Sequence, residues 1–484
     1  MRVRFKVLYL LTALATPAGL ASAQTGAPAK PAQVNPGAAQ APRPATAQPA
    51  AQQPVPQQPG AQPPAAVQEA PAVPPPPPPP PPVWTLVDAN QLLLSILTSA
   101  KEGLDPKDYD AAGLMTAMRS NDPLLLSAAA TERFNKLSSD LALGHVRGKD
   151  RQNWHIPDPD LDEARQDQLL RYSLAQHRIG EALAGLLPSH PQYAALKHAL
   201  ELTPKTEGEK VNRIRLNMDR WRWLPRDLGD RYIIVNVPAY TAALVENGVT
   251  VSRHRAVAGA LKTQTPQLMA TATGVILNPW WEVPPSISKE VAGKPGYVAL
   301  KGPDGKIQRW RQPPGPRNAL GQIKFVMYNP QNIYLHDTTA KTLFDAKARA
   351  YSHGCIRTEH ILLLAERLLS EGVPAAPAPA PAPAPAQTPA AADETTPAPA
   401  ATPAVWTPEK VKATVASQKT VQANFPKPLP VYIVYMSSAA LQDGSIKDYA
   451  DIYKKDGKVI AALNNAPTAP KTPATKPDDK VATR

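Results

Sequence analysis

Hydrophobic residues recur at two different spacings along the chain, and the spacing changes near residue 230. Upstream, the segments NQLLLSILTSA (90–100) and RYSLAQHRIGEALAGLL (171–187) place apolar residues at helical spacing. The segments EGLDPKDYD and LLPSHPQY interrupt them with turn-forming residues. The pattern predicts that residues 85–205 are mainly α-helical. No charged cluster in this region indicates a site, so we assign it a supporting role.

The downstream pattern predicts strands. Ile214, Met218 and Trp221 lie at i, i+4 and i+7 and give one last, short basic helix its apolar stripe. β-prone residues follow in RYIIVNVPAY, and Asn247-Gly248 between two such runs is a strong signal for a hairpin. The remaining predicted elements are strands at 323–327, 332–335 and 431–435, and a helix over EHILLLAERLLSEG that ends near Gly372.

Proline sets the limits of the folded regions. The chain has 59 prolines, which concentrate in residues 24–83, in residues 373–404 and from about residue 466. Such segments cannot bury enough apolar surface to fold, so we expect disordered, extended spacers or docking elements. A helix-like TPEKVKATVASQ and a strand-like LPVYIVYM lie beyond residue 404. We therefore interpret 373–404 as an insertion within the mainly β region.

The first residues predict export. Arg2, Arg4 and Lys6 precede an apolar run at 7–20, and Ala21-Ser22-Ala23 follows as a small-residue cleavage site, the pattern of a secretory signal peptide. An uncleaved anchor is the alternative, but the run is short and interrupted for a bilayer span. No other segment reaches transmembrane length. We expect a periplasmic protein with no transmembrane segment after cleavage.

The net charge limits which partners the protein can bind, and the cysteine content limits its disulfide chemistry. The formal net charge of +13 suits a polyanionic environment, and for an exported protein a carboxylate-rich cell wall or an anionic membrane surface fits better than nucleic acid. The chain has a single cysteine, so it forms no internal disulfide. A lone thiol in an oxidising compartment is a liability unless its chemistry is used.

That cysteine stands in YSHGCIRTEH (351–360), among residues that suit nucleophilic chemistry. We place Cys355 one or two residues before a predicted helix, whose N-terminal dipole would stabilise a thiolate, and Arg357 adds a cation. Gly354 has no Cβ, so a substrate carbonyl could approach backbone N–H groups there. His353 and the more distant His336 are candidate bases. These parts make an acyl-transfer site conceivable.

Two other interpretations of the same residues stay open on composition alone. A lone cysteine is most often a small buried hydrophobe. Zinc accepts histidine and cysteine ligands, so His336, His353 and Cys355 could also bind a metal. However, His353 and Cys355 are closer in sequence than the usual ligand pair, and no fourth ligand stands out.

The motif SHGCIR, with YLHD placing His336 nineteen residues before Cys355, resembles the signature of the L,D-transpeptidases of bacterial cell-wall synthesis. Further blocks are similar to the large periplasmic branch of that family: RWRWLPRDLGDRYIIVNVPAY, NPWWEVPPSI, PPGPRNALGQIKF, NIYLHDTTAKTLFD and PVYIVYMSSA. The segments GLDPKDYD and LLPSHPQYAAL are similar to its helical scaffold region. Together these blocks cover most of the chain outside the proline-rich segments.

The resemblance implies an α+β fold. A mainly β, β-sandwich-like catalytic domain would follow an α-helical scaffold domain, with long proline-rich disordered segments. The predicted boundaries are a signal peptide at 1–23, a proline-rich linker at 24–83, the scaffold domain at 84–210, the catalytic domain at 211–465 with its insertion at 373–404, and a disordered tail at 466–484.

Carried over to this chain, the resemblance implies that Cys355 is the nucleophile and His336 the general base. His353 and Gly354 would shape the oxyanion hole. Arg357 would bind a carboxylate of the peptide stem, because its forked guanidinium matches that group.

Four further residues complete the predicted site. Ser352 would support the loop, and Tyr334 would line the pocket on the same strand face as His336. Core packing is an equal alternative for Tyr334. Trp280 and Trp281 would border the donor groove, although packing is the commoner role of such aromatics.

The implied reaction is a two-step acyl transfer that needs no metal or organic cofactor. The cysteine would attack the carbonyl of the third stem residue, typically diaminopimelate, and expel the terminal D-Ala. An amine of a second stem would then resolve the thioester. Family members are typically inactivated by carbapenems, which acylate the same thiol.

The sequence departs from the large members of the family in two places. No room is left for a peptidoglycan-binding module, and the segment between NPWWEVPPSI and PPGPRNALG, which caps the cleft in similar enzymes, is short. Both 3-3 cross-links and 1-3 cross-links from L-Ala to diaminopimelate therefore stay open. An L,D-carboxypeptidase and a non-catalytic wall-associated scaffold are the alternatives. Expected partners are peptidoglycan stem peptides and other cell-wall proteins.

Overall fold

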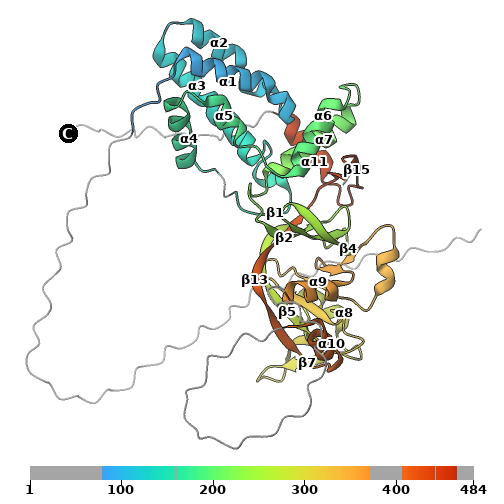
Figure 1. The fold of residues 1–484 in the computed structure, drawn as a ribbon. Coiled ribbons are helices and arrows are strands. Elements are labelled where there is room, and N and C mark those ends of the chain that lie inside the picture. Colours follow the sequence, from blue (N-terminus) through green and yellow to red (C-terminus); the bar gives the residue numbers. More distant parts are fainter. Residues whose placement is uncertain (1–78, 159–160, 371–405, 442, 466–484) are drawn as a thin grey trace, which may run out of the picture. The chain divides into compact units, whose positions relative to one another are not determined.

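The computed structural model describes residues 79–158, 161–370, 406–441 and 443–465. The predicted signal peptide, most of the linker, the insertion and the tail lie outside these ranges. Within them, helices dominate the first part of the chain and strands the second (Figure 1), as the spacing of hydrophobic residues predicts. The α+β fold class is confirmed.

The helices of the first part begin at strong capping residues. Thr85 and Asp88 form a capping box at the first helix, and Asp122 caps the third, which has Pro123 at its first position. The helices are α1 (Leu86–Thr98), α2 (Ala111–Arg119), α3 (Pro123–Leu143), α4 (Glu163–Ala175), α5 (Ile179–Ala184), α6 (Pro191–Leu202) and α7 (Gly208–Arg222), with 3₁₀ turns η1 (Ser99–Glu102), η2 (Pro106–Tyr109) and η3 (Gly148–Arg151).

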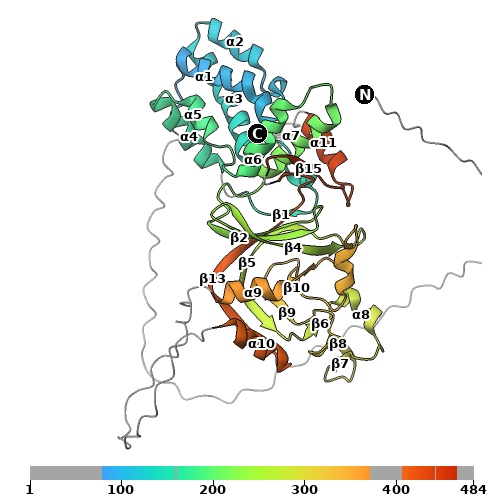
Figure 2. The ribbon, with the colours of Figure 1, turned by 45° about the vertical axis from the view of Figure 1, so that its right-hand side comes forward.

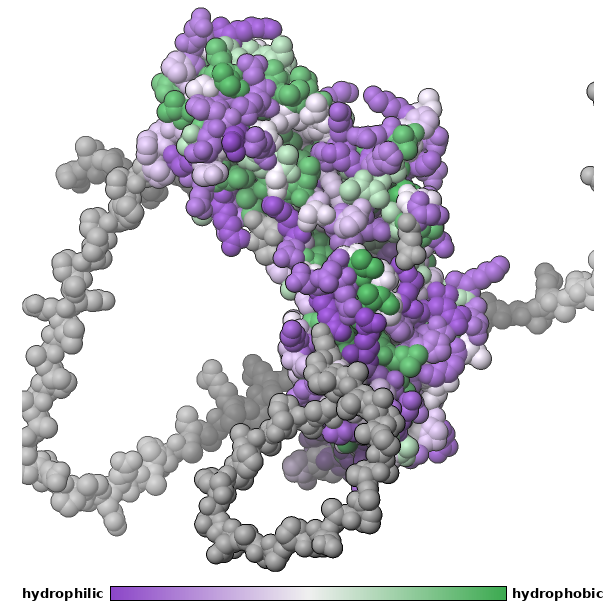
Figure 3. Space-filling view, viewed as in Figure 1, coloured by the Kyte–Doolittle hydropathy of each residue, from purple (hydrophilic) through white to green (hydrophobic). Residues whose placement is uncertain are grey.

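Helices α1 to α5 share a core of their own, centred on buried residues such as Leu92, Phe134 and Leu137. The opposite side of α1 and the start of α3 remain apolar and exposed (Figure 3). The exposed residues there are Leu86, Val87, Leu94, Leu97, Leu124 and Leu125.

The strands of the second part pair into one large sheet. Its order is β1-β5-β13-β2-β3-β4-β12-β10-β9, with β11 beside β4. Because β9 pairs with β5 as well as with β10, the sheet closes on itself. Its strands are β1 (Trp154–His155), β2 (Arg231–Asn236), β3 (Thr241–Glu246), β4 (Val249–Gly259), β5 (Gln267–Leu277), β9 (Ile323–Val326), β10 (Leu335–His336), β11 (Ala350–Ser352), β12 (Ile356–Thr358) and β13 (Val421–Val434).

Some of the strand predictions are confirmed by the structure, and one is wrong. The Asn247-Gly248 turn joins β3 to β4, with φ of 49° and 77°, so the predicted hairpin is confirmed. Strand β13 lies between β5 and β2, so the chain returns to the same sheet after residue 405. The strand predicted at 332–335 was wrong, since only Leu335 of that segment is in β10. Asn332 instead has φ of 53°, a turn conformation.

The main core fills the closed sheet. It joins the strands to the helices α9 (Ile361–Leu369) and α10 (Pro408–Ala416), which follow β12 and precede β13. On the outer side, α6 and α7 pack on β2 and β13 through a separate cluster that includes Trp221 and Tyr432. The stripe predicted at Ile214, Met218 and Trp221 is buried there.

Two smaller parts complete the described chain. After β13 come β14 (Ser438–Ala440), β15 (Ile446–Asp448) and the helix α11 (Asp456–Asn464), which packs on α7. The other part is the cap, residues 281–312, with β6 (Trp281–Glu282), α8 (Pro285–Val291), β7 (Val298–Lys301) and β8 (Ile307–Gln312). The turn η4 (Lys341–Asp345) lies between β10 and β11. Across the described ranges, every helix is too short or too polar to cross a bilayer.

Candidate active site

A cavity of about 790 Å³ lies between the cap and the closed sheet, where β6, β8 and α8 stand beside β9 and β10 (Figure 2). We call it the cysteine cavity. Apart from Gly354, every residue predicted for the site lines it: Trp280, Trp281, Tyr334, His336, Ser352, His353, Cys355 and Arg357. The fold therefore brings the residues predicted from the sequence together around one cavity.

Residues 352–355 form a tight loop between β11 and β12. The Ser352 hydroxyl donates to the Cys355 carbonyl at 2.6 Å and accepts from the Gly354 N–H at 3.1 Å. Gly354 has φ of +121°, and a Cβ there would lie 3.2 Å from Ile333 Cδ1, so the loop requires glycine. Of the expected roles, only that of Gly354 changes accordingly. Ser352 is buried and shapes the loop, and the Gly354 N–H is already occupied rather than free for an oxyanion.

A second loop, residues 260–265, holds the first one in place. The fully buried Thr265 donates through Oγ1 to the Gly354 carbonyl at 2.7 Å and accepts from the Gly259 N–H at 2.9 Å. Thr263 Oγ1 donates to the Ser352 carbonyl at 2.9 Å. The Tyr453 hydroxyl donates to the Gly259 carbonyl at 2.6 Å. No local pattern in the sequence signals the contacts of Thr263 and Thr265 with residues 352–354 or that of Tyr453 with Gly259, because they join residues far apart in the chain.

Cys355 is half-buried, with its Sγ 3.6 Å from the Asn332 carbonyl. The thiol also forms hydrogen bonds with the backbone and the hydroxyl of Tyr334. Burial raises the pKa of the Cys355 thiol, although Tyr334, Lys324 and Arg357 act in the opposite direction. The predicted helix start at this position was wrong. β12 follows the cysteine directly, and α9 begins only at Ile361, so no helix dipole favours the thiolate.

His336 lies in β10 and is 5% exposed. Its ring contacts Tyr334 edge to face at a centroid distance of 5.6 Å, so the two residues do share a face. Burial, together with the nearby cations Arg357 and Lys324, lowers the pKa of His336 to about 3, against the opposing effect of a hydrogen bond with the Asp337 backbone. The imidazole is therefore neutral at physiological pH, and its buried Nδ1 has no hydrogen-bond partner among the described residues.

These two shifts define the resting state of the pair. Burial favours the uncharged thiol of Cys355 and the uncharged imidazole of His336. The candidate nucleophile and its candidate base are thus both neutral at rest, so charge would have to develop during any proton transfer between them.

Two cations line the cavity on either side of His336. Arg357 lies next to His336 across the parallel β10–β12 pair, and Lys324 lies next to it across the antiparallel β10–β9 pair. Burial lowers the pKa of both cations. The Lys324 ammonium lies 4.0 Å from the centre of the Tyr334 ring. Sequence analysis missed Lys324, whose only local signal is a charge inside the strand IKFV.

The remaining predicted residues face the cap. His353 pairs with Glu290 of α8 at 3.2 Å, so its ring joins the loop to the cap. The Trp280 ring stacks with Arg311 of β8 at 4.2 Å, a packing role within the cavity wall. In the part of the chain that the structure describes, no group of three or more histidine, cysteine or acidic side chains is arranged to hold a metal ion.

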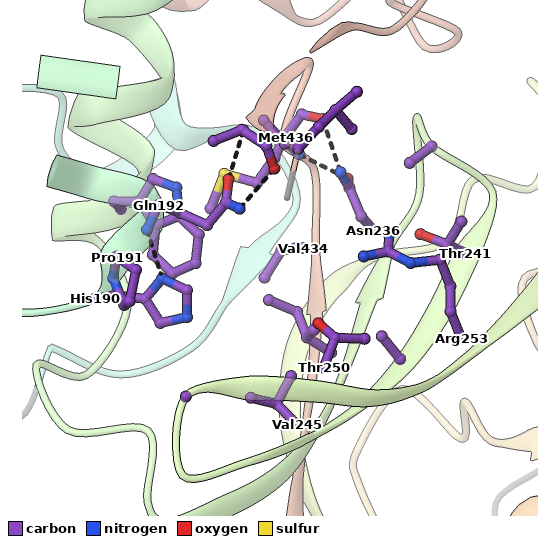
Figure 4. Close-up of a pocket in the computed structure, with 18 of the residues that line it drawn as sticks. His190, Pro191, Gln192, Asn236, Thr241, Val245, Thr250, Arg253, Val434 and Met436 are labelled. Carbon is purple, nitrogen blue, oxygen red and sulfur yellow. Dashed lines mark hydrogen bonds between the residues drawn. The ribbon is translucent and has the colours of Figure 1, made fainter. Parts of the chain in front are cut away.

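A second cavity of about 140 Å³ lies between α6, β2 to β4 and residues 434–441 (Figure 4). Its two amide side chains form hydrogen bonds with backbone groups. Gln192 exchanges hydrogen bonds of 2.7 and 2.8 Å with Ala440, and Asn236 exchanges two of 3.0 Å with Met436. These contacts fasten the segment after β13 to the sheet. The lining of the second cavity includes none of the residues predicted for the site, so the cysteine cavity is the candidate active site.

Comparison with protein families supports this choice. The model of the YkuD L,D-transpeptidase catalytic domain matches residues 230–398, a range that contains the whole lining of the cysteine cavity. The chain carries an L,D-transpeptidase catalytic domain. A scaffold-domain model matches residues 80–200 upstream of the L,D-transpeptidase domain, over helices α1 to α6. The predicted family resemblance is confirmed.

Individual relatives of the L,D-transpeptidase domain are distant. A Haemophilus influenzae protein provisionally named as an L,D-transpeptidase is 27% identical over 285 residues, which are 53% of this chain and 51% of that protein. The chain thus spans about half the length of this curated relative. An L,D-transpeptidase of Mycobacterium smegmatis is 17% identical over 27% of this chain and 50% of its own, with a TM-score of 0.18. A catalytic domain of E. faecium L,D-transpeptidase acylated by ertapenem is 15% identical over 28% of this chain and 84% of its own, also with a TM-score of 0.18.

Proposed function

We propose that the protein is a periplasmic L,D-transpeptidase that cross-links peptidoglycan stem peptides through a thioester on Cys355. One observation carries the proposal: Cys355 and a neutral His336, whose Nδ1 has no hydrogen-bond partner among the described residues, line one cavity within the matched domain. The signal-peptide pattern and the net charge of +13 fit an enzyme that works on an anionic cell wall.

The first step is acylation. The Cys355 sulfur attacks the carbonyl of the donor stem while its proton passes to His336, because both groups are neutral at rest. The Tyr334 hydroxyl, which is hydrogen-bonded to the thiol, is placed to donate to the developing oxyanion. The C–N bond on the far side of the attacked carbonyl then breaks, which releases D-Ala from a position-3 donor or the amine of the second stem residue from a position-1 donor, and His336 returns its proton to that leaving amine.

The second step regenerates the thiol. An amine of the acceptor stem attacks the thioester, loses a proton to His336, and displaces the Cys355 sulfur, which takes that proton back. Arg357 holds a donor carboxylate near the sulfur throughout, as its place beside the cavity allows. The acyl group comes from stem position 3 or from L-Ala at position 1. Hydrolysis of the same thioester would instead make the protein an L,D-carboxypeptidase.

The test compares wild-type protein with Cys355→Ala in a host that lacks its own L,D-transpeptidases. Muropeptides are separated by liquid chromatography and identified by mass spectrometry. We expect dimers that depend on Cys355, and their fragmentation identifies the donor position. Trimmed stems without dimers would indicate a carboxypeptidase, and products unchanged by the substitution would refute the Cys355 mechanism.

A direct check uses the purified protein and ertapenem, since the E. faecium domain carries that acyl group. We expect one added ertapenem mass on the wild-type protein and none on Cys355→Ala. The variant Lys289→Met removes an exposed charge from the cap outside the cavity, so it should acylate like the wild type.

A further inference from the structure

The charged residues of the cysteine cavity divide into paired and unpaired groups. On the cap side, Glu282 and Arg309 lie 3.7 Å apart, and His353 pairs with Glu290 at 3.2 Å. On the sheet side, Lys324 and Arg357 form no ion pair with any described residue, and Arg357 Nε has no hydrogen-bond partner there. The cavity therefore presents two cations that the rest of the described chain leaves unpaired.

The positions of these cations follow from strand register. Lys324, His336 and Arg357 occupy directly paired positions on the three neighbouring strands β9, β10 and β12. All of them line the same cavity, so they form one row across the sheet with His336 in the middle. Neighbouring strands are about 4.8 Å apart, which places the two outer Cα atoms about 10 Å from each other.

Holding Lys324 in this row has an energetic cost. Burial lowers the pKa of its ammonium, and its nearest described partner is the face of the Tyr334 ring at 4.0 Å. Glu282 of the cap attracts this ammonium electrostatically, but among the described residues its ion pair is with Arg309. A cation that has lost part of its hydration without forming an ion pair is expected to bind an anion from outside. A peptidoglycan stem carries several carboxylates, so one peptide can engage two cations about 10 Å apart.

We propose that Lys324 is a second carboxylate-binding residue for the donor stem, on the opposite side of His336 from Arg357. The inference rests on the proposed function, because it takes the donor to be a stem peptide. Two carboxylates held on either side of His336 fix the direction in which the peptide crosses the cavity. Lys324 thereby helps to decide which carbonyl reaches Cys355, and so acts on donor choice.

Binding to a protein without its nucleophile tests this inference apart from the reaction. The probe is the tetrapeptide L-Ala–γ-D-Glu–diaminopimelate–D-Ala, titrated calorimetrically into Cys355→Ala and into the double variant Cys355→Ala/Lys324→Met. We expect Lys324→Met to raise the Kd about tenfold or more, which is typical of a lost charge-assisted hydrogen bond. Lys324→Arg should recover most of the affinity. Lys289→Met on the exposed side of α8 is the matched charge control and should change nothing.

The carboxylate that Lys324 binds is identified with three tetrapeptides, each amidated at a different carboxylate. One amidation should weaken binding to Cys355→Ala by the same factor as Lys324→Met and have no further effect in the double variant. This readout keeps Lys324 intact in one arm, so a structural defect of the variant cannot produce it.

The outcomes separate the two proposals. Equal affinities with and without Lys324→Met, or a loss that is independent of every amidation, would overturn the role of Lys324. The muropeptide products would still decide the proposed function. Conversely, Lys324-dependent binding without any Cys355-dependent product would support the inference and refute the transpeptidase reaction.

Discussion

The two walls of the cysteine cavity are built very differently. The sheet wall consists of β9, β10, β12 and residues 352–355, and it rests on the main core of the domain. The cap has a hydrophobic cluster with only three buried residues, Val283, Ile287 and Val291, and most of its charged side chains are exposed. The groups that would do the chemistry lie on the sheet wall, and the cap supplies much of the surface that surrounds them.

The contrast shows that the sheet wall is held firmly in place, whereas the cap is held by few buried contacts. Ser352 holds Gly354 and Cys355 through hydrogen bonds within the loop, and Thr265 ties that loop to a distant segment, so Cys355 cannot shift without breaking several of these bonds. The hydrophobic cluster of the cap is separate from the main core. Under the proposed function, donor selection would then depend on Lys324 and Arg357 of the sheet wall.

The largest expected difference between the walls is in core packing. Ile356 is fully buried in the main core, so Ile356→Ala should reduce the free energy of unfolding by about 2–5 kcal/mol. Ile287→Ala in the cap should reduce it by less than about 1 kcal/mol, because the cap can open locally without unfolding the sheet. Urea denaturation followed by circular dichroism measures both. Equal losses would mean that the cap and the sheet unfold as one unit.

The next comparison lies within the sheet wall. Thr265→Val should cost about 2–3 kcal/mol of unfolding free energy, because it leaves the Gly354 carbonyl and the Gly259 N–H without their partner. Thr263→Val is the matched control and should cost about 1 kcal/mol or less, since the Ser352 carbonyl keeps its bond from the Ala260 N–H. Muropeptide yield should fall with the first variant and persist with the second. The reverse order would show that the 260–265 loop does not anchor the nucleophile.

A smaller effect, whose direction is fixed, is expected in how the reactivity of the Cys355 thiol depends on pH. Burial raises the thiol pKa above its ordinary value, so at pH 6–8 the thiolate fraction should rise about tenfold with each pH unit. Alkylation by iodoacetamide, read by mass spectrometry, should follow that slope without a plateau near neutrality. A plateau between pH 5 and 7 would reveal a preformed thiolate–imidazolium pair and contradict the neutral resting state.

The smallest effect is expected for the charges of the cap. Glu282 and Arg309 lie 3.7 Å apart and are both more than half exposed, so Glu282→Gln should change the unfolding free energy by less than about 0.5 kcal/mol. The same denaturation assay checks it. A cost above 2 kcal/mol would mean that the cap is held as firmly as the sheet wall.

Much of this organisation could be predicted from the sequence, and the failures have physical causes. Helices α1 to α7 and the β3–β4 hairpin follow from local periodicity, capping and turn residues. β10 is only two residues long and is held by two neighbouring strands, so local propensity could not set its limits. The sequence predicts a helix start just after Cys355 because the apolar run that follows is helical. In the structure, the residues between them form β12, which pairs with β4 and β10.

The sequence by itself predicted the family, which the comparisons confirm, and a candidate nucleophile and base, because SHGCIR and the upstream His336 are local patterns of residue type and spacing. Tertiary structure alone decided their chemical state. Burial sets the direction of the Cys355 and His336 pKa shifts, and strand register brings Lys324 into one row with His336 and Arg357. Neither burial nor register is a local property, since both depend on which distant segments of the chain pack together.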